Sequence, residues 1–317
     1  MLPQGSLGQQ QDWRCDGALG SQRPDGVAFV ARLRILIRAC RPRQWIKNLL
    51  VLTAPIAAGV ATQPWAALQM AVAVVVFCLA ASGIYLVNDT VDVKADRVHA
   101  TKRRRPVASG ELSVRAARTA AVVLLAGALV MSVLLNWHLL VVVAVYEAVQ
   151  LWYCLGMKNE PVIELTSVAS GFLLRAIAGG VATNVPLSPW FLIAAGFGSL
   201  FMAAGKRYAE KCRVQEDGVI IRPVLVRYTA TYLRFVWTMS AGVLVTTYSL
   251  WGFTLRQTSS NEWSVVSIIP FVMAMLRYAV DVDSGAAGEP EEIVLRDRSL
   301  LLLGGIWAAC LMASLYL

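Results

Sequence analysis

The feature that most constrains this chain is a series of nine long apolar runs, which starts near residue 46 and continues to the C-terminus. Each run has about 17–22 residues, enough for a helix to cross a hydrocarbon core of about 30 Å. Composition agrees with this, because 57% of the residues are hydrophobic, only 15% are charged and the mean hydropathy is +0.58. We therefore predict an all-α membrane protein, a bundle of nine transmembrane helices. The predicted spans are 46–62, 66–87, 116–135, 138–156, 162–182, 189–205, 232–253, 264–280 and 299–317.

The distribution of positive charge predicts how the bundle is oriented. All but two of the 29 Lys and Arg residues fall on one side, when those at the span ends are counted with the adjoining loop. The exceptions are Arg175, inside a span, and Arg256, in an opposite loop. By the positive-inside rule the basic side is cytoplasmic. We expect a multi-pass plasma-membrane protein with a cytoplasmic N-terminus and a polar cavity that faces the cytoplasm.

The N-terminal residues and the net charge indicate the domain organisation and the kind of partner. Residues 1–30 are rich in Gly and Gln and are predicted to be a disordered tail without a signal peptide. Residues 31–317 are predicted to form a single catalytic domain. The net charge of +9 is interpreted as a topology signal and a source of anion-binding groups, because no nucleic-acid-binding motif accompanies it.

A group of carboxylates follows the second span. Asn88, Asp92 and Asp96 recur at i, i+4 and i+8, which places them on one helical face with Asp89 beside them. Carboxylates that converge at a membrane boundary repel one another unless a cation is present. Hard oxygen ligands suit Mg²⁺, which also binds substrate phosphates. We therefore predict that these four residues hold Mg²⁺ and its bound waters.

A basic run comes directly after the carboxylates. Lys102, Arg103 and Arg105 lie within Thr101–Pro106 and can neutralise the phosphate charge that a metal ion leaves over. A topology signal or contact with anionic lipid headgroups is the alternative interpretation of the same run. The combination of carboxylates and cations predicts a site for a Mg²⁺-bridged polyphosphate.

The number of spans and the motif formed by Asn88, Asp89, Asp92 and Asp96 resemble those of the UbiA superfamily of intramembrane prenyltransferases. The resemblance extends over about residues 40–317. Members that prenylate aromatic substrates carry a second aspartate-rich motif after the sixth span. Here that place is Gly205–Glu210, where Lys206 and Arg207 stand instead of a carboxylate pair. This departure favours a ligand with more phosphate to bind directly.

Several other strings are similar to a phosphoribosyltransferase branch of the superfamily. They lie at 41–48, 96–106, 174–180, 205–210 and 277–283. This resemblance implies transfer of 5-phosphoribose from phosphoribosyl pyrophosphate (PRPP) to decaprenyl phosphate or another polyprenyl phosphate, with release of pyrophosphate. It also implies that the product serves cell-wall arabinan synthesis. The lipid would reach the site laterally from the membrane, and PRPP would arrive from water.

Roles follow for individual side chains. Lys47, Tyr153, Asp92 and Asp96 are the candidate catalytic residues. Tyr153 and Lys158 resemble a tyrosine-to-lysine pairing of the superfamily, and Glu164 is expected to orient a ribose hydroxyl or Lys158. The residues predicted to contact substrate are Lys47, Asn88, Lys102, Arg103, Arg105, Tyr153, Lys158, Glu164, Arg175, and a cationic wall of Lys206, Arg207 and Tyr208.

Some interpretations stay open at this point. Arg175 either pairs with Glu147 on the neighbouring span or faces the cavity and meets a phosphate. An aromatic prenyltransferase that uses a prenyl diphosphate is one alternative function, and a membrane transporter is another. The sequence does not specify the lipid chain length, and it leaves homo-oligomer formation open.

Overall fold

The computed structural model describes residues 25–217, 224–258, 261–284, 293 and 296–317. Within these ranges the secondary structure is helical, which confirms the predicted all-α class. The first half contains α1 (Asp25–Ala39), η1 (Pro42–Leu52), α2 (Thr53–Ala57), α3 (Pro64–Val91), α4 (Val93–Val98), η2 (Lys102–Arg104), α5 (Pro106–Ser109), α6 (Val114–Leu135), α7 (Trp137–Cys154), η3 (Met157–Asn159) and α8 (Ile163–Ala182). The second half contains α9 (Pro189–Asp217), α10 (Val224–Arg227), α11 (Ala230–Thr258), α12 (Trp263–Val266), α13 (Ile268–Asp283) and α15 (Arg298–Tyr316).

Six helical segments of the described chain are long and apolar enough to cross a membrane. They are Pro64–Val91, Val114–Leu135, Trp137–Cys154, Ile163–Ala182, Trp263–Asp283 and Arg298–Tyr316. Helices α9 and α11 contain two further predicted spans and have 29 residues each, but they are not among the six. The count of nine spans therefore stays a prediction.

The first predicted span, 46–62, does not form one continuous helix. Its residues are divided between the 3₁₀-helix η1 and the short α2, which ends before Gly59, a residue with φ of +70°. Helix η1 packs directly against α8 at Gly179, where an added Cβ would lie 1.7 Å from the carbonyl oxygen of Val51. Glycine is thus needed at this position for the close approach.

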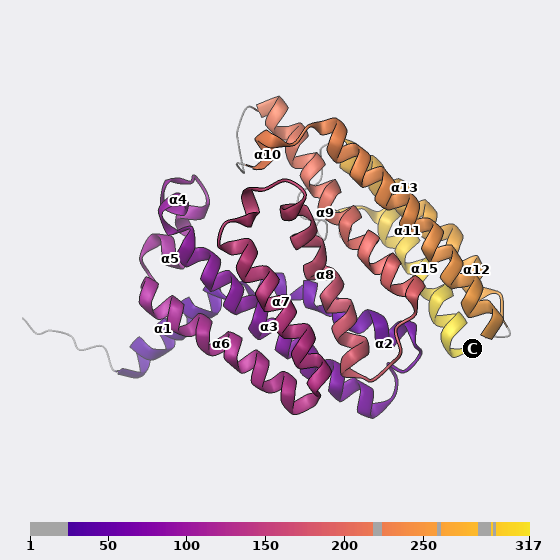
Figure 1. The fold of residues 1–317 in the computed structure, drawn as a ribbon, viewed down its shortest axis with the longest axis horizontal. Coiled ribbons are helices and arrows are strands. Elements are labelled where there is room, and N and C mark those ends of the chain that lie inside the picture. The colour runs from indigo at the N-terminus through magenta and orange to yellow at the C-terminus, as the bar shows by residue number, and fades with distance from the viewer. Residues whose placement is uncertain (1–24, 218–223, 259–260, 285–292, 294–295) are drawn as a thin grey trace, which may run out of the picture.

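Helix α8 joins two packed halves of the molecule (Figure 1). Its N-terminal part, with Leu165 and Ala169, packs with α9, α11, α13 and α15. Its C-terminal part, with Ala178 and Ala182, packs with η1, α3, α6 and α7. A smaller core joins α1 to α3, α5 and α6 through residues such as Ala39. Since α8 belongs to both larger cores, a shift of this helix would disturb both halves.

The helix ends that carry polar residues meet at one end of the bundle. Ion pairs or hydrogen bonds there connect α3 to η3, α8 to α9, and α9 to α11 and α13. This end also holds α4, η2 and α5. Residues 1–24 of the predicted tail lie outside the described residues, and α1 begins at Asp25, inside the range assigned to the tail.

Candidate active site

The carboxylates predicted from the sequence lie where α3 gives way to α4. The helix is interrupted at Asp92, but the Asp96 amide still donates to the Asp92 carbonyl oxygen at 2.8 Å, so the expected spacing is largely kept. Asp89 and Asp96 are buried, with exposed fractions of 2% and 3%. Buried carboxylates need partners, because burial of an unpaired charge is strongly unfavourable.

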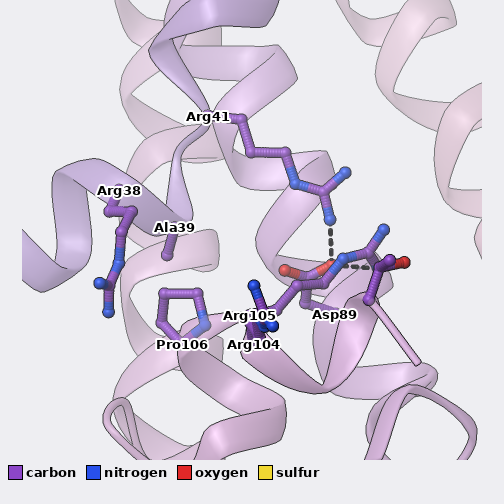
Figure 2. A pocket seen from close by; sticks show the side chains of 8 residues that line it. Arg38, Ala39, Arg41, Asp89, Arg104, Arg105 and Pro106 are labelled. Atoms are coloured by element: carbon purple, nitrogen blue, oxygen red, sulfur yellow. Dashed lines mark hydrogen bonds and ion pairs between the residues drawn. The ribbon is translucent and has the colours of Figure 1, made fainter. Parts of the chain in front are cut away.

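Arginines supply those partners. Arg41 forms an ion pair with Asp89 (Figure 2). Arg105 Nη1 lies 3.2 Å from Asp89 Oδ1 and 2.7 Å from Asp96 Oδ2, so one guanidinium bridges the two buried carboxylates. The side chains of Arg41 and Arg105 remain 27% and 25% exposed, which leaves both accessible from the solvent side. Arg105 of the basic run therefore lies against the carboxylates.

Asp92 takes a different partner, because it forms an ion pair with Lys158 of η3. This contact joins the end of α3 to the segment that follows α7. Both side chains are about one quarter exposed, at 26% for Asp92 and 23% for Lys158. Lys158 thus belongs to the carboxylate cluster.

A pocket of about 250 Å³ opens beside Asp89. Figure 2 shows Arg41 and Arg105 reaching toward the Asp89 carboxylate from different segments of the chain. The pocket is lined by Arg38, Ala39, Arg41, Asp89, Thr101, Arg104, Arg105 and Pro106. Four arginines and one aspartate give this lining a strong positive excess, which suits an anion that carries more than one charge.

Three of the four arginines in this lining were not among the predicted site residues: Arg38, Arg41 and Arg104. Arg41 adopts a left-handed backbone conformation (φ 55°, ψ 62°) and its guanidinium lies 4.9 Å from the centre of the Tyr85 ring. Arg41 and Asp89 are 48 positions apart in the sequence, so no local motif could indicate that they pair. The available signal was indirect, because buried aspartates require counter-ions and a basic segment precedes the first span.

Arg207 does not belong to the cationic wall that was predicted after the sixth span. Arg207 is buried, with 4% exposed, and its Nε donates to Glu164 Oε1 at 2.8 Å while Nη1 lies 3.0 Å from Glu210 Oε2. Burial opposes the charged form of Arg207, but Glu210 and Glu164 outweigh it and raise the pKa of the guanidinium. Glu164 accordingly binds Arg207 and not Lys158. This triad holds α8 against α9.

The other two residues of the predicted wall, Lys206 and Tyr208, do not lie on the same face of α9 either. Tyr208 donates to Asp283 Oδ1 at 2.9 Å and stacks on Trp237, on the side of α9 that faces α11 and α13. Consecutive residues of a helix are about 100° apart, so residues 206, 207 and 208 cannot share one face. Lys206 is half-buried and its role in substrate binding stays a prediction.

Arg175 does not pair with Glu147. It donates to Asn48 Oδ1 at 2.8 Å, to the Gly171 carbonyl oxygen at 2.6 Å and to Tyr146 Oη at 3.0 Å. These partners are neutral, so the structure excludes the ion pair with Glu147. Arg175 is a buried cation that contacts η1 and α7.

The other candidates lie around the carboxylate cluster or at its edge. Lys47 is half-buried in η1, next to Asn48, and Lys102 is half-buried in η2. Arg103 is exposed and is not among the residues that line the pocket. Asn88 is half-buried in the last turn of α3, and Tyr153, in the last turn of α7, lies close enough to Arg207 to affect it electrostatically.

The predicted metal site overlaps this cluster of carboxylates and arginines. Among the described residues, no three His, Cys, Asp or Glu side chains are grouped closely enough to hold a metal ion as they stand. However, Asp89 and Asp96 already converge on a single positive group of Arg105, and their donors are all oxygen. This donor chemistry fits Mg²⁺, provided that the bridging guanidinium moves.

Comparison with known proteins places this arrangement in a family. Residues 49–314 match the UbiA prenyltransferase family. The chain belongs to that family. A solved UbiA homolog from Archaeoglobus fulgidus, bound to DMAPP and Mg²⁺, has the same fold with a TM-score of 0.66 at 18% identity, over 89% of this chain and 97% of that one. The family and the membrane-spanning helices together make the chain a multi-pass membrane protein.

Nearer relatives within the UbiA family share a specific description. Two proteins described as decaprenyl-phosphate phosphoribosyltransferase are 52% identical in Mycolicibacterium smegmatis (89% of this chain, 92% of the relative) and 53% identical in Mycobacterium tuberculosis (88% and 93%). A third, from Corynebacterium glutamicum, is 50% identical over 89% of this chain and 87% of its own length. The resemblance inferred from short strings therefore extends over most of the chain.

Proposed function

We propose that this protein transfers 5-phosphoribose from PRPP to decaprenyl phosphate at the cytoplasmic face of the plasma membrane, and that the product serves cell-wall arabinan synthesis. The observation that carries the proposal is a pocket lined by four arginines and by the buried Asp89, at the polar end of a membrane-spanning bundle. The relatives at 50–53% identity support the choice of donor and acceptor.

The pocket suits the charged part of the donor. PRPP carries a 5-phosphate and a 1-pyrophosphate, and guanidinium groups bind phosphate oxygens in a bidentate manner. Arg38, Arg41, Arg104 and Arg105 offer such groups from two segments of the chain, and they face the same opening. The lipid acceptor is held by its apolar tail in the membrane, so the two substrates meet at this end of the bundle.

The reaction requires few proton transfers. The bond between C1 of ribose and the pyrophosphate oxygen breaks, and a bond forms between C1 and an oxygen of the lipid phosphate. That oxygen is already anionic, so no strong general base is needed. Catalysis then depends on neutralising the leaving pyrophosphate and on aligning the two substrates.

Mg²⁺ is part of the proposal. Asp89, Asp92 and Asp96, together with Asn88, are the residues that would hold it. When bound, the ion neutralises pyrophosphate oxygens and so improves the leaving group. Solved members of the family bound to Mg²⁺ and to Cd²⁺ support the use of a divalent ion. The arginines of the pocket neutralise the phosphate charge that the ion leaves over.

The test is an assay with purified protein, radiolabelled PRPP, decaprenyl phosphate and Mg²⁺. We expect label in the lipid fraction and release of pyrophosphate, both lost when EDTA is added. Turnover of a prenyl diphosphate with an aromatic acceptor, without labelled lipid from PRPP, would contradict the proposal and favour the aromatic prenyltransferase.

A variant of Asp92 separates chemistry from folding. Asp92 is only partly buried, so Asp92→Ala should leave thermal unfolding nearly unchanged while turnover falls by at least about 100-fold. Thermal unfolding and initial rates are measured on the same preparation. A variant that retains the wild-type rate would show that this carboxylate takes no part in catalysis.

A further inference from the structure

Each aspartate of the motif at the end of α3 already has a cationic side chain as its partner. Asp89 is held by Arg41 and Arg105, Asp96 by Arg105, and Asp92 by Lys158. The position between Asp89 and Asp96 is the important one. There a single guanidinium nitrogen contacts both carboxylates, which are two of the residues that would hold a divalent ion.

We propose that Arg41 and Arg105 make divalent-metal binding conditional on a polyphosphate. The metal ion takes over the carboxylates only when phosphate groups take over the arginines. This inference rests on the proposed function, since it assigns to the same site an order of assembly: donor and metal bind together, and neither binds tightly alone.

Charge balance supports the exchange. A divalent ion placed on Asp89 and Asp96 beside the two arginines meets like charge at short range, and the released guanidinium groups lose their partners. A diphosphate removes both penalties, because each guanidinium exchanges a carboxylate for phosphate oxygens.

Geometry supports it as well. Arg41 and Arg105 line the pocket and hold the carboxylates at once, so they need only reorient their side chains to meet a ligand in that space. Their partial exposure means that no core has to open. By linkage, a polyphosphate that favours metal binding is itself bound more tightly when metal is present, by the same factor.

The experiment measures Mn²⁺ binding by isothermal titration and electron paramagnetic resonance, on the full chain in detergent or nanodiscs. In Arg105→Gln the metal no longer competes with the bridging guanidinium, so Mn²⁺ alone should bind about tenfold tighter than to wild type. Inorganic pyrophosphate, titrated at a fixed Mn²⁺ concentration, should bind more weakly to the same variant. A general loss of structure would weaken both, so the opposite signs identify the exchange.

Arg104→Gln is the matched control, because Arg104 lines the same pocket but has no ion pair with these aspartates in the structure. It should weaken pyrophosphate binding and change Mn²⁺ binding by less than about threefold. Adding Asp89→Asn to Arg105→Gln should abolish the gain in Mn²⁺ affinity. If Arg105→Gln fails to fold, Arg41→Gln provides the same test, since it also removes a cation from Asp89.

Failure of this inference is distinct from failure of the proposed function. Unchanged or weaker Mn²⁺ affinity in a folded Arg105→Gln or Arg41→Gln variant would overturn the exchange, and so would equally tight Mn²⁺ binding to wild type with and without pyrophosphate. Neither measurement uses ribose or lipid. The proposed function stands or falls separately, on formation of labelled lipid from PRPP.

Discussion

Arg175 and Arg207 are both buried arginines of this bundle, but they differ in the charge of their neighbours. Arg207 lies between Glu164 and Glu210, whereas the hydrogen-bond partners of Arg175 are neutral. The first therefore belongs to a compensated ion cluster that joins α8 to α9. The charge of Arg175 is not balanced by a carboxylate among these partners. The rings of Phe77 and Tyr146, whose centres lie 5.6 and 4.9 Å from its guanidinium, stabilise it instead.

The difference predicts how Arg207 responds to substitution. Among the residues that the structure describes, Arg207 is the one cation in contact with the Glu164 carboxylate, a side chain with 1% exposed, and Arg207→Gln removes it. Breaking a buried pair by removing one partner costs about 3–5 kcal/mol, so the free energy of unfolding should fall by that amount. Unfolding of the detergent-solubilised protein in SDS, followed by circular dichroism, measures it.

The double variant Glu164→Gln with Arg207→Gln is the control for this prediction. It leaves no unpaired charge at residue 164, so most of the lost stability should return. Equal stability of the single and double variants would show that the unpaired Glu164 carboxylate is not the source of the loss.

Individual site residues could be predicted from the sequence only where their spacing is local. The Asp89, Asp92 and Asp96 motif and Arg105 lie on one continuous segment, so their nearness was expected from the sequence, whereas the direct contact of Arg105 with Asp89 and Asp96 was not. Arg41 could not be identified in the same way, because its role arises from a left-handed backbone and a partner 48 residues away. For the same reason the charge pattern did not reveal that Arg207 is internal.

At the scale of elements, the contact between η1 and α8 depends on the absence of a side chain at Gly179. An added methyl group would overlap the carbonyl oxygen of Val51, and backbone atoms cannot move aside as a side chain can. Gly179→Ala should therefore destabilise the protein by about 1–3 kcal/mol or more, measured by thermal unfolding. Turnover should also fall, because η1 carries Lys47 and Asn48 and follows Arg41.

Gly127→Ala is the matched control, since Gly127 lies inside α6 and an added Cβ would meet no atom within 4 Å. Alanine favours a helix interior over glycine by about 0.5–1 kcal/mol, so this variant should be as stable as wild type or slightly more stable. A Gly179→Ala protein that unfolds at the same temperature as Gly127→Ala would mean that η1 can shift without loss.

The start of α15 gives a pH-dependent prediction. Asp297 caps this helix by accepting from the Ser299 amide at 2.8 Å, and Arg277 of α13 holds the pKa of its carboxyl below the usual range. A lowered folded-state pKa contributes stability that is complete above the ordinary value near 3.9 and is lost as the pH falls through the folded value. This contribution should therefore be present at pH 7, begin to decline at about pH 4 and vanish once the pH is below the lowered folded-state pKa.

Asp297→Asn tests that expectation, because asparagine caps helices as well as aspartate does but lacks the charge. Thermal unfolding should occur at a lower temperature than in wild type at pH 7, and the two temperatures should converge as the pH falls below about 4. A constant difference across this range would assign the effect to the cap geometry and not to the ion pair with Arg277.

At the scale of the whole molecule, hydropathy predicted the helical class and most helix positions, because a chain in lipid has to satisfy its backbone within helices. It could not predict that residues 46–62 divide into η1 and α2. An apolar run indicates only that a segment is buried in lipid or protein, and it does not indicate which kind of helix forms. The 3₁₀-helix η1 packs closely on α8 at Gly179, a tertiary contact that no sequence window contains.

The orientation of the bundle is the remaining prediction at this scale, and it can be tested by impermeant labelling. The structure places exposed Arg103 at the polar end, whereas exposed Glu262 pairs with Arg256 in the connection between α11 and α12.

Single cysteines are introduced at each position in a background without the native cysteines. In a cell with the predicted orientation, Arg103→Cys should react with a membrane-impermeant maleimide only in inside-out vesicles, and Glu262→Cys only in right-side-out vesicles. Because the proposed donor PRPP is soluble and charged, the side on which Arg103→Cys reacts is also the side from which that donor would reach the arginine pocket. Labelling of Arg103→Cys in right-side-out vesicles would place that pocket outside the cell and contradict both the orientation and the proposed route of the donor.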